Sequence, residues 1–206
     1  MSARVEEEKR QAAESAAELV EAGMTVGLGT GSTVAHLLPA LARRGLDIRC
    51  VATSRATEEQ GRQLGLRIDG FRSIERLDIA IDGADQVTPD RWLIKGGGGA
   101  HTREKIVAAA ADRFVVIVSA DKLVASLTAP VPLELMEFGL EATLRALRTA
   151  SVRPGSPPSP DGGVIADWTG PLDDPAALAA QLAAVPGVVD HGLFPPSMVS
   201  DVIVGS

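Results

Sequence analysis

Cysteine and tyrosine are almost missing from this chain of 206 residues, which has one cysteine, Cys50, and no tyrosine. A single cysteine excludes an internal disulfide and suits a reducing cytoplasm. Cys50 lies in the apolar stretch IRCVAT, and this setting favours a small buried side chain over a nucleophile. Aromatic residues make up only 3% of the chain, so a surface that stacks nucleic-acid bases is not expected.

Long hydrophobic runs and basic clusters are also missing. No apolar run approaches the length of a membrane span, and the charged N-terminus lacks the apolar centre of a signal peptide. The chain has 27 acidic residues against 20 Lys and Arg, which argues against nucleic acid as a general partner. We therefore expect a soluble, cytoplasmic protein without a membrane or nucleic-acid partner, in which a local site holds any bound anion.

Short apolar strands alternate with helical patterns through the first part of the chain. We expect strands at residues 24–29, 47–52, 77–82, 91–95 and 113–119, and helices at residues 5–20, 33–44, 55–64 and 102–111. This alternation predicts a mainly parallel sheet that helices cover on both faces.

The pattern changes near Pro130. An extended segment, a helix, a loop rich in Pro, Gly and Ser, a strand, a helix and a strand follow, at residues 129–136, 137–149, 153–163, 163–168, 174–184 and 187–194. The last segment, 198–206, reads as a strand that returns to the first sheet. The expected fold is α/β: a mainly parallel sheet domain, residues 1–129 plus 198–206, with a smaller α+β domain, residues 130–197, inserted before the last strand.

The stretch GLGTGST, residues 27–33, joins a strand to a helix, a geometry that points backbone N–H groups at an anion. It does not fit the dinucleotide fingerprint, because Ser32 stands where the third glycine belongs. The hydroxyls of Thr30, Ser32 and Thr33 favour a small phosphate monoester, and a turn capped by Ser or Thr is the alternative. TSRAT, residues 53–57, opens the following helix, and capping explains it at least as well as ligand contact.

The stretch DGADQVTPDRWLIKGGGGAHTREK, residues 82–105, combines acidic residues, a lysine and four consecutive glycines, which have no side chains. Asp82 ends an apolar strand, at the edge where parallel sheets bind ligands, and Asp85 follows in the turn. Lys95 ends another apolar strand and runs into four glycines, which permit close backbone approach to a ligand. Glu104 lies in the first turn of the next helix. Turn chemistry and the helix dipole explain each feature singly, but together they predict a catalytic site.

These motifs resemble ribose-5-phosphate isomerase of type A. The resemblance rests on GLGTGST, TSRAT, DGADQ, LIKGGGGAHTREKIVA, ADK at 120–122 and PLEL at 132–135, in matching order along essentially the whole chain. It implies a Rossmann-like domain with a smaller α+β lid, and interconversion of ribose 5-phosphate and ribulose 5-phosphate in the non-oxidative pentose phosphate pathway. It also implies no metal or other cofactor, and a homo-oligomer, either a dimer or a tetramer.

The same resemblance assigns roles to individual residues. Glu104 matches the catalytic base, and Asp82 and Lys95 match the catalytic polar set. The residues implied to bind the sugar phosphate are Lys9, Thr30, Gly31, Ser32, Thr33, Asp82, Gly83, Ala84, Asp85, Lys95, Gly96, Gly97, Gly98 and Lys122. In the implied reaction Glu104 moves a proton between C2 and C1, while Lys95 and the glycine loop stabilise the enediolate.

Two positions depart from the family pattern. Gln86 stands where the family usually has Glu, and His101 stands where it usually has an apolar residue. They leave open an isomerase of another sugar phosphate on the same scaffold, and a non-catalytic phosphosugar-sensing domain is the other alternative. A packed or partly exposed imidazole is favoured for His101. His36 and His191 have no partners at metal-ligand spacing, so no zinc site is expected.

Overall fold

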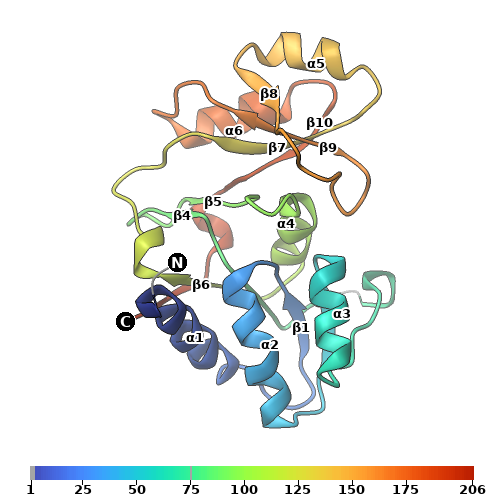
Figure 1. Cartoon of the computed structure of the whole chain (residues 1–206), viewed down its shortest axis with the longest axis vertical. Coiled ribbons are helices and arrows are strands. Elements are labelled where there is room, and N and C mark those ends of the chain that lie inside the picture. Colours follow the sequence, from blue (N-terminus) through green and yellow to red (C-terminus); the bar gives the residue numbers. More distant parts are fainter. Residues whose placement is uncertain (1–2, 75) are drawn as a thin grey trace. The chain divides into compact units, whose positions relative to one another are not determined.

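The computed structural model describes residues 3–74 and 76–206, so the first two residues of the expected domain lie outside the described part (Figure 1). These residues form two compact units. The first unit comprises residues 1–84, 103–123 and 197–206, and the second comprises residues 85–102 and 124–196. No helix among the described residues is both long and apolar enough to cross a membrane.

The first unit is built on a five-stranded sheet in the order β12-β6-β3-β1-β2, and every neighbouring pair is parallel. Its strands are β1 (Thr25–Leu28), β2 (Arg49–Ala52), β3 (Ile79–Asp82), β6 (Phe114–Ser119) and β12 (Asp201–Gly205). The expected parallel sheet is thus confirmed, as is the return of the last strand to it. Strands buried on both faces explain the nearly continuous apolar runs in the sequence.

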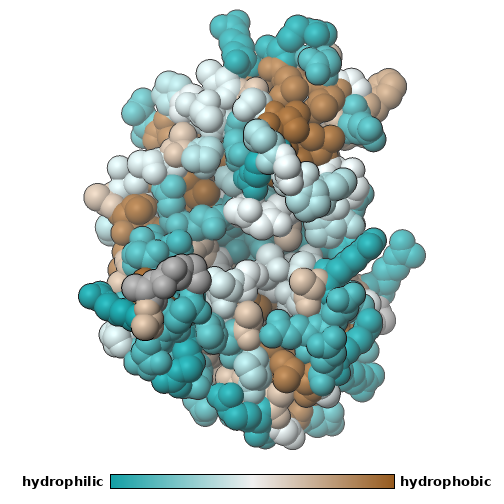
Figure 2. Space-filling view, in the orientation of Figure 1, coloured by the Kyte–Doolittle hydropathy of each residue, from teal (hydrophilic) through white to brown (hydrophobic). Residues whose placement is uncertain are grey.

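Helices and short 3-10 turns connect these strands. They are α1 (Ala3–Ala17), α2 (Ser32–Arg44), α3 (Arg55–Gln63), η1 (Phe71–Ser73), α4 (His101–Ala109), which continues into the first unit from the second, and η2 (Ala120–Lys122). The first core joins alanines of α1 and leucines of α2 to the central strands. Hydrophilic side chains cover most of the visible face over α1, α2 and α3 (Figure 2). Such one-sided burial is what amphipathic helices provide.

The order of the strands places a topological switch point between β1 and β3. The chain leaves β1 through α2 to reach β2 on one side, and β3 lies on the other side of β1. Connections that diverge in this way open a gap at the carboxyl ends of the two strands, where α/β proteins bind ligands. Gly29 follows β1 and Asp82 ends β3, so both predicted elements lie at this point.

The second unit holds two antiparallel sheets, in the orders β10-β7-β9-β8 and β11-β5-β4. Its elements are β4 (Gln86–Val87), β5 (Leu93–Ile94), β7 (Val131–Leu135), α5 (Leu140–Leu147), β8 (Ala150–Val152), β9 (Val164–Trp168), α6 (Pro175–Ala183), β10 (Val188–His191) and β11 (Leu193–Phe194), and η3 (Pro196–Met198) follows. A second core of leucines and Trp168 fills this unit, consistent with the expected α+β domain.

The two units differ from the expected domain ranges in two segments and at residue 197, which belongs to the first unit. Residues 85–102 and 124–129 belong to the second unit, although their sequence position places them beside the first. The physical reason is strand pairing, because β4 and β5 form their sheet with β11. The expected strand at 91–95 is therefore β5, in an antiparallel sheet, and β4 was not expected.

The segment at 187–194 was expected to be one strand, and this was wrong. Gly192 divides it into β10 and β11, which join different sheets. A Cβ atom on Gly192 would lie 2.1 Å from the carbonyl oxygen of Lys95, so only glycine fits. The carbonyl of Gly192 accepts a hydrogen bond from the N–H of Lys95 at 2.9 Å. The expected helix 137–149 is also shorter, because Gly139 has a φ of +75° and α5 begins after it.

Candidate active site

The loop between β1 and α2 leaves two hydroxyl groups available to a ligand. Gly31 is the N-cap of α2 and has a φ of 106°, a conformation that favours glycine. No side chain caps this helix, so the alternative of a Ser or Thr cap does not apply. The Thr30 hydroxyl lies 2.7 Å from that of Ser54. Within the described residues, by contrast, the hydroxyls of Ser32 and Thr33 have no hydrogen-bond partner.

The TSRAT segment caps a helix and supports this loop. Ser54 is the N-cap of α3, and its hydroxyl accepts a hydrogen bond from the N–H of Thr57. The Thr57 hydroxyl donates to the carbonyl of Gly29 at 2.9 Å. Capping therefore accounts for TSRAT, as the sequence allowed. TSRAT also holds the loop after β1 in place, and no pattern in the sequence predicted this second role.

Asp82 contacts the same loop from the end of β3. Its side chain is only 3% exposed, and Oδ1 accepts hydrogen bonds from the N–H groups of Thr30, at 3.1 Å, and Gly83, at 2.7 Å. A Cβ atom on Gly29 would lie 1.9 Å from this carboxylate. The bare backbone at Gly29 therefore allows the carboxylate to close on the loop. Ala84 follows, half-buried, in the turn.

Glu104 faces the sheet from the first turn of α4 and is 4% exposed. A Cβ atom on Gly27 of β1 would meet the side chain of Val107, so this face of α4 lies against β1. The N–H of Leu77, just before β3, donates to the carbonyl of Ala110, so the helix ends at the amino edge of the sheet. Because residues three apart share a helix face, Glu104 lies one turn nearer the carboxyl edge of β1 and β3.

Lys9 of α1 is held by an acidic neighbour. It is 3% exposed, and its Nζ lies 2.8 Å from Oε1 of Glu6. The other oxygen of Glu6 lies 3.2 Å from Nε2 of His36, on α2. Hydrogen bonds first from Lys9 and then from His36 lower the pKa of Glu6 below its usual value. Glu6 therefore stays charged at neutral pH and links the buried lysine to α2.

Lys122 lies in η2, and its Nζ is 3.4 Å from Oδ2 of Asp121. The N–H of Ala120, which begins η2, donates to Oε2 of Glu8 at 3.1 Å. Hydrogen bonds from Arg4 and then from this N–H lower the pKa of Glu8. The carboxylate of Glu8 therefore ties η2 to α1, the helix that carries Lys9.

Lys95 and the glycines after it lie in the second unit. The Lys95 side chain is 3% exposed, and its Nζ lies 5.6 Å from the centre of the Phe194 ring. A cation over an aromatic face is stabilised by the quadrupole of the ring. Gly96 has a φ of 108°, and a Cβ atom on it would lie 2.6 Å from Nδ1 of His101. The first glycine of the run is therefore required both by its conformation and by its close neighbour.

Asp85 fastens the middle of this glycine loop, defined as residues 96–99. Its Oδ2 accepts a hydrogen bond from the N–H of Gly97 at 2.8 Å. The N–H of Gly99 donates to the carbonyl of Gly96 at 3.0 Å. The N–H of Gly98 has no partner within residues 3–74 and 76–206, and Gly98 is exposed. One backbone donor therefore remains for a ligand.

The two departures from the family pattern have structural explanations. Gln86 donates to the carbonyl of Thr128 and accepts from its N–H, both at 2.8 Å. A carboxylate has no proton to donate to that carbonyl, so this pair of bonds requires an amide. His101 is fully buried at the start of α4 against Gly96, which matches the expected packed imidazole.

Neither a metal-ligand cluster nor a reactive thiol marks another site. Among the described residues, no group of three or more His, Cys, Asp or Glu side chains has the arrangement to hold a metal ion. Burial, followed by the charge of Asp69, raises the pKa of the Cys50 thiol to about 12. The thiol therefore stays protonated at neutral pH, in agreement with its interpretation as a buried apolar side chain.

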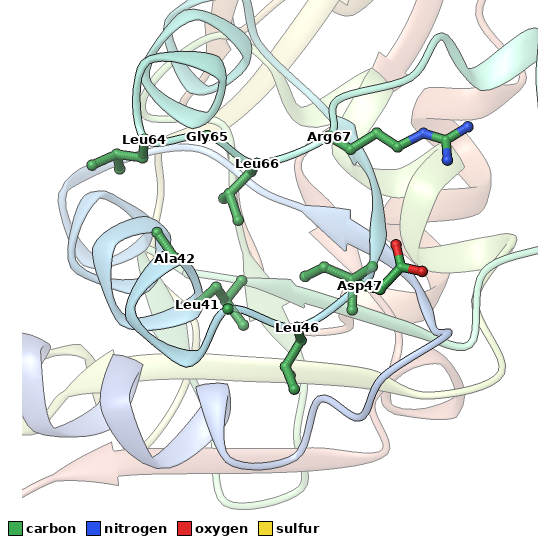
Figure 3. A pocket seen from close by; sticks show the side chains of 10 residues that line it. Leu41, Ala42, Leu46, Asp47, Leu64, Gly65, Leu66 and Arg67 are labelled. Atoms are coloured by element: carbon green, nitrogen blue, oxygen red, sulfur yellow. The ribbon is translucent and has the colours of Figure 1, made fainter.

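A separate pocket of about 180 Å³ lies at the other end of α2 (Figure 3). Leu41, Leu46 and Leu66 line it, with Asp47 and Arg67 beside them. Since α2 has 13 residues, this pocket is roughly 20 Å along the helix from the loop between β1 and α2. It is therefore distinct from the site at the carboxyl edge of the sheet.

Comparisons with known proteins find relatives that match most of this chain. A family model described as "Ribose 5-phosphate isomerase A (phosphoriboisomerase A)" matches residues 49–206. A ribose-5-phosphate isomerase A from Rhodopseudomonas palustris is 46% identical over 92% of this chain and 90% of its own length.

Two solved structures have the same fold. Ribose 5 phosphate isomerase A from Neisseria gonorrhoeae has a TM-score of 0.93 at 33% identity, covering 98% of this chain and 93% of its own. A D-ribose-5-phosphate isomerase in complex with phospho-erythronic acid has a TM-score of 0.93 at 36% identity, covering 100% and 96%. The likeness in sequence and in structure extends over nearly the whole of both chains, and this chain therefore belongs to the ribose 5-phosphate isomerase A family.

Proposed function

We propose that this chain is an aldose–ketose isomerase that interconverts D-ribose 5-phosphate and D-ribulose 5-phosphate through an enediolate. The observation that carries the proposal is the carboxyl edge of β1 and β3. There the buried carboxylate of Asp82 contacts a phosphate-type loop with two unbonded hydroxyls, and Glu104 faces the same edge. A phosphosugar needs one anchor for its phosphate and a base for its carbon chain, and this edge offers both.

The reaction requires one proton carrier and one stabiliser of negative charge. We propose that Glu104 takes the proton from C2 of the open-chain aldose, and that the C–H electrons form the C1–C2 double bond as charge moves to O1. The proton on O2 then passes to O1, and Glu104 returns its proton to C1 while the C2 carbonyl forms. Lys95 and the N–H of Gly98 supply the cation and the donor that the enediolate oxygens need.

The remaining residues bind and orient the substrate. In this proposal Thr30, Gly31, Ser32 and Thr33, together with Lys9 and Lys122, hold the phosphate. Asp82 and Asp85, with the backbone of Gly83, Ala84, Gly96 and Gly97, hold the sugar hydroxyls, and one of the two acids assists ring opening. The phospho-erythronic acid bound by a solved relative is consistent with an enediolate route, because that ligand joins a phosphate to a planar carboxylate with two oxygens, like an enediolate.

A coupled assay over several pentose and hexose phosphates tests the proposal. We expect ribose 5-phosphate to give the highest kcat/KM. A higher value for another aldose phosphate would favour the isomerase of another sugar phosphate. Tight binding of phosphosugars without turnover of any of them would favour a sensing domain.

Removing both free hydroxyls of the phosphate loop should weaken phosphate binding. We expect Ser32→Ala with Thr33→Ala to raise KM for ribose 5-phosphate by at least about 10–100-fold, the usual value of one hydrogen bond to a charged group, with little change in kcat. Steady-state kinetics on ribose 5-phosphate and on unphosphorylated ribose make the test. Ser15→Ala, on the exposed face of α1, is the control. An equal loss on both substrates would show that the loop is only a turn.

Activity should not depend on a metal or a nucleotide cofactor. The proposed proton transfer uses only a carboxylate, a lysine and backbone donors, so we expect unchanged kcat after exhaustive dialysis against EDTA. The measurement is the initial rate before and after dialysis, with Mg²⁺, Mn²⁺ or Zn²⁺ added back. A rate that falls on dialysis and returns with one of these ions would contradict the mechanism.

We also propose that the protein is a cytoplasmic homo-oligomer and that its second unit serves as the lid. The second unit exposes Met136 (52%), Phe138 (90%) and Val189 (47%). Val189 belongs to β10, an edge strand of the four-stranded sheet, and Met136 follows the neighbouring β7. Exposed apolar side chains on and beside an edge strand are typical of a protein interface, which supports association through this unit.

A further inference from the structure

Arg153 contacts the glycine loop from a distant part of the sequence. Its Nη1 donates to the carbonyl oxygens of Gly96 and Gly97, each at 3.0 Å. Its Nε and Nη2 donate to the two oxygens of Asp167, on β9, at 2.8 and 2.6 Å. The side chains of Arg153 and Asp167 are each 20% exposed. No sequence motif indicates a role for Arg153, because it stands at the start of the Pro/Gly/Ser loop.

The pairing with Asp167 fixes the direction of the guanidinium. A planar guanidinium with two parallel bonds to a carboxylate is held in one orientation, so Nη1 is directed at the loop. The hydrogen bonds that Arg153 donates to Asp167 raise the pKa of its guanidinium, and an arginine side chain is charged at neutral pH. Arg153 therefore offers the loop a fixed donor rather than a mobile surface charge.

The glycine loop needs such a support. Four consecutive glycines carry no side chains to pack, and glycine loses more conformational freedom than any other residue when its backbone is fixed. Arg153 holds the carbonyls of Gly96 and Gly97, and Asp85 holds the N–H of Gly97. The loop is thus held through donors and acceptors on both of its sides, and the N–H of Gly98 is left exposed.

We propose that Arg153 is a positioning residue for the isomerase reaction, holding the glycine loop so that the N–H of Gly98 meets the negative charge of the enediolate. This inference rests on the function proposed above. Arg153 acts through the loop and does not contact the substrate. Since the charge develops only in the transition state, losing this support lowers kcat far more than it raises KM.

The test compares Arg153→Gln with Arg145→Gln, a change at an exposed arginine of α5 in the same unit. We expect Arg153→Gln to lower kcat for ribose 5-phosphate by about 10–100-fold, below the full cost of a lost oxyanion donor, with KM within threefold of the parent. Arg145→Gln should match the parent. Arg153→Lys should recover only part of the rate, because an ammonium group cannot bond Asp167 and both carbonyls in the same geometry.

Two further measurements separate positioning from folding. Ethylguanidinium added to Arg153→Ala should raise kcat, whereas ethylammonium at the same ionic strength should not. Asp167→Asn keeps the arginine but loosens its orientation. It should also lower kcat, by a smaller factor than Arg153→Gln does. If Arg153→Gln fails to fold, Asp167→Asn alone decides the matter through its kcat and KM.

The outcomes distinguish this inference from the proposed function. No turnover of ribose 5-phosphate by the parent and by Arg145→Gln would overturn the function, and the inference with it. Turnover by the parent that is equal in folded Arg153→Gln, or a change in KM alone, would overturn only the role of Arg153.

Discussion

Replacing Glu104 by glutamine is expected to lower kcat for ribose 5-phosphate by about a hundredfold or more, the typical cost of losing a general base. Glutamine has nearly the shape of glutamate, but its amide cannot accept and return a proton. Glu104 is 4% exposed in the first turn of α4, so a change that preserves its shape leaves the surrounding side chains in place. The measurements are steady-state kinetics and the exchange of the C2 hydrogen with solvent deuterium.

Binding should survive this substitution, because the phosphate anchor is a different group of residues. We expect calorimetric titration with ribose 5-phosphate to give a Kd for Glu104→Gln within a few-fold of the parent's KM. Glu141→Gln provides the control, since Glu141 lies in the first turn of α5 and is exposed. Near-normal turnover in folded Glu104→Gln would eliminate Glu104 as the base, and loss of binding would assign it a role in holding the substrate.

Adding one methyl group at Gly29 is expected to cost about a hundredfold in kcat/KM, as small misplacements of catalytic groups do. The new Cβ atom would lie 1.9 Å from Cγ and Oδ1 of Asp82, so the carboxylate must move. Its hydrogen bond with the N–H of Thr30 would break as a result. Overpacking of this kind also lowers the free energy of unfolding by about 1–3 kcal/mol.

The control for Gly29→Ala is Gly70→Ala, where no atom lies within 4 Å of the new Cβ. Gly70 has a φ of −74°, which alanine adopts without strain. We therefore expect Gly29→Ala to change both the kinetics and the denaturant midpoint, and Gly70→Ala to match the parent in both. If Gly29→Ala keeps its kcat/KM within threefold, the contact between Asp82 and the loop is not needed for catalysis.

Much of the fold could be predicted from local patterns. The short apolar runs and helical repeats of the first unit predicted β1, β2, β3 and β6 in order, and their parallel pairing was confirmed. Periodicity reports which side chains turn toward a core, and that information is local to each segment. Strand pairing is not local. The split at Gly192 and the antiparallel place of β5 depend on which distant backbone approaches closely, and the sequence does not record this.

Local sequence motifs were enough to name the chemical groups of the candidate site. The motifs named the carboxylates of Asp82 and Glu104, the cation of Lys95 and the bare glycine loop, because each stands in a short contiguous pattern. How these groups are supported depends on the tertiary structure. It bonds the hydroxyl of Thr30 to that of Ser54, whereas the hydroxyl of Ser32 has no partner among the described residues.

The support of the glycine loop shows most clearly what the sequence could not provide. Arg153 lies 57 residues along the chain from Gly96, whose carbonyl it bonds. A hydrogen bond of 3.0 Å between such distant residues exists only when the backbone between them returns to the same place. That path is set by the pairing of β8 with β9 and of β9 with β7, which no motif around Arg153 encodes.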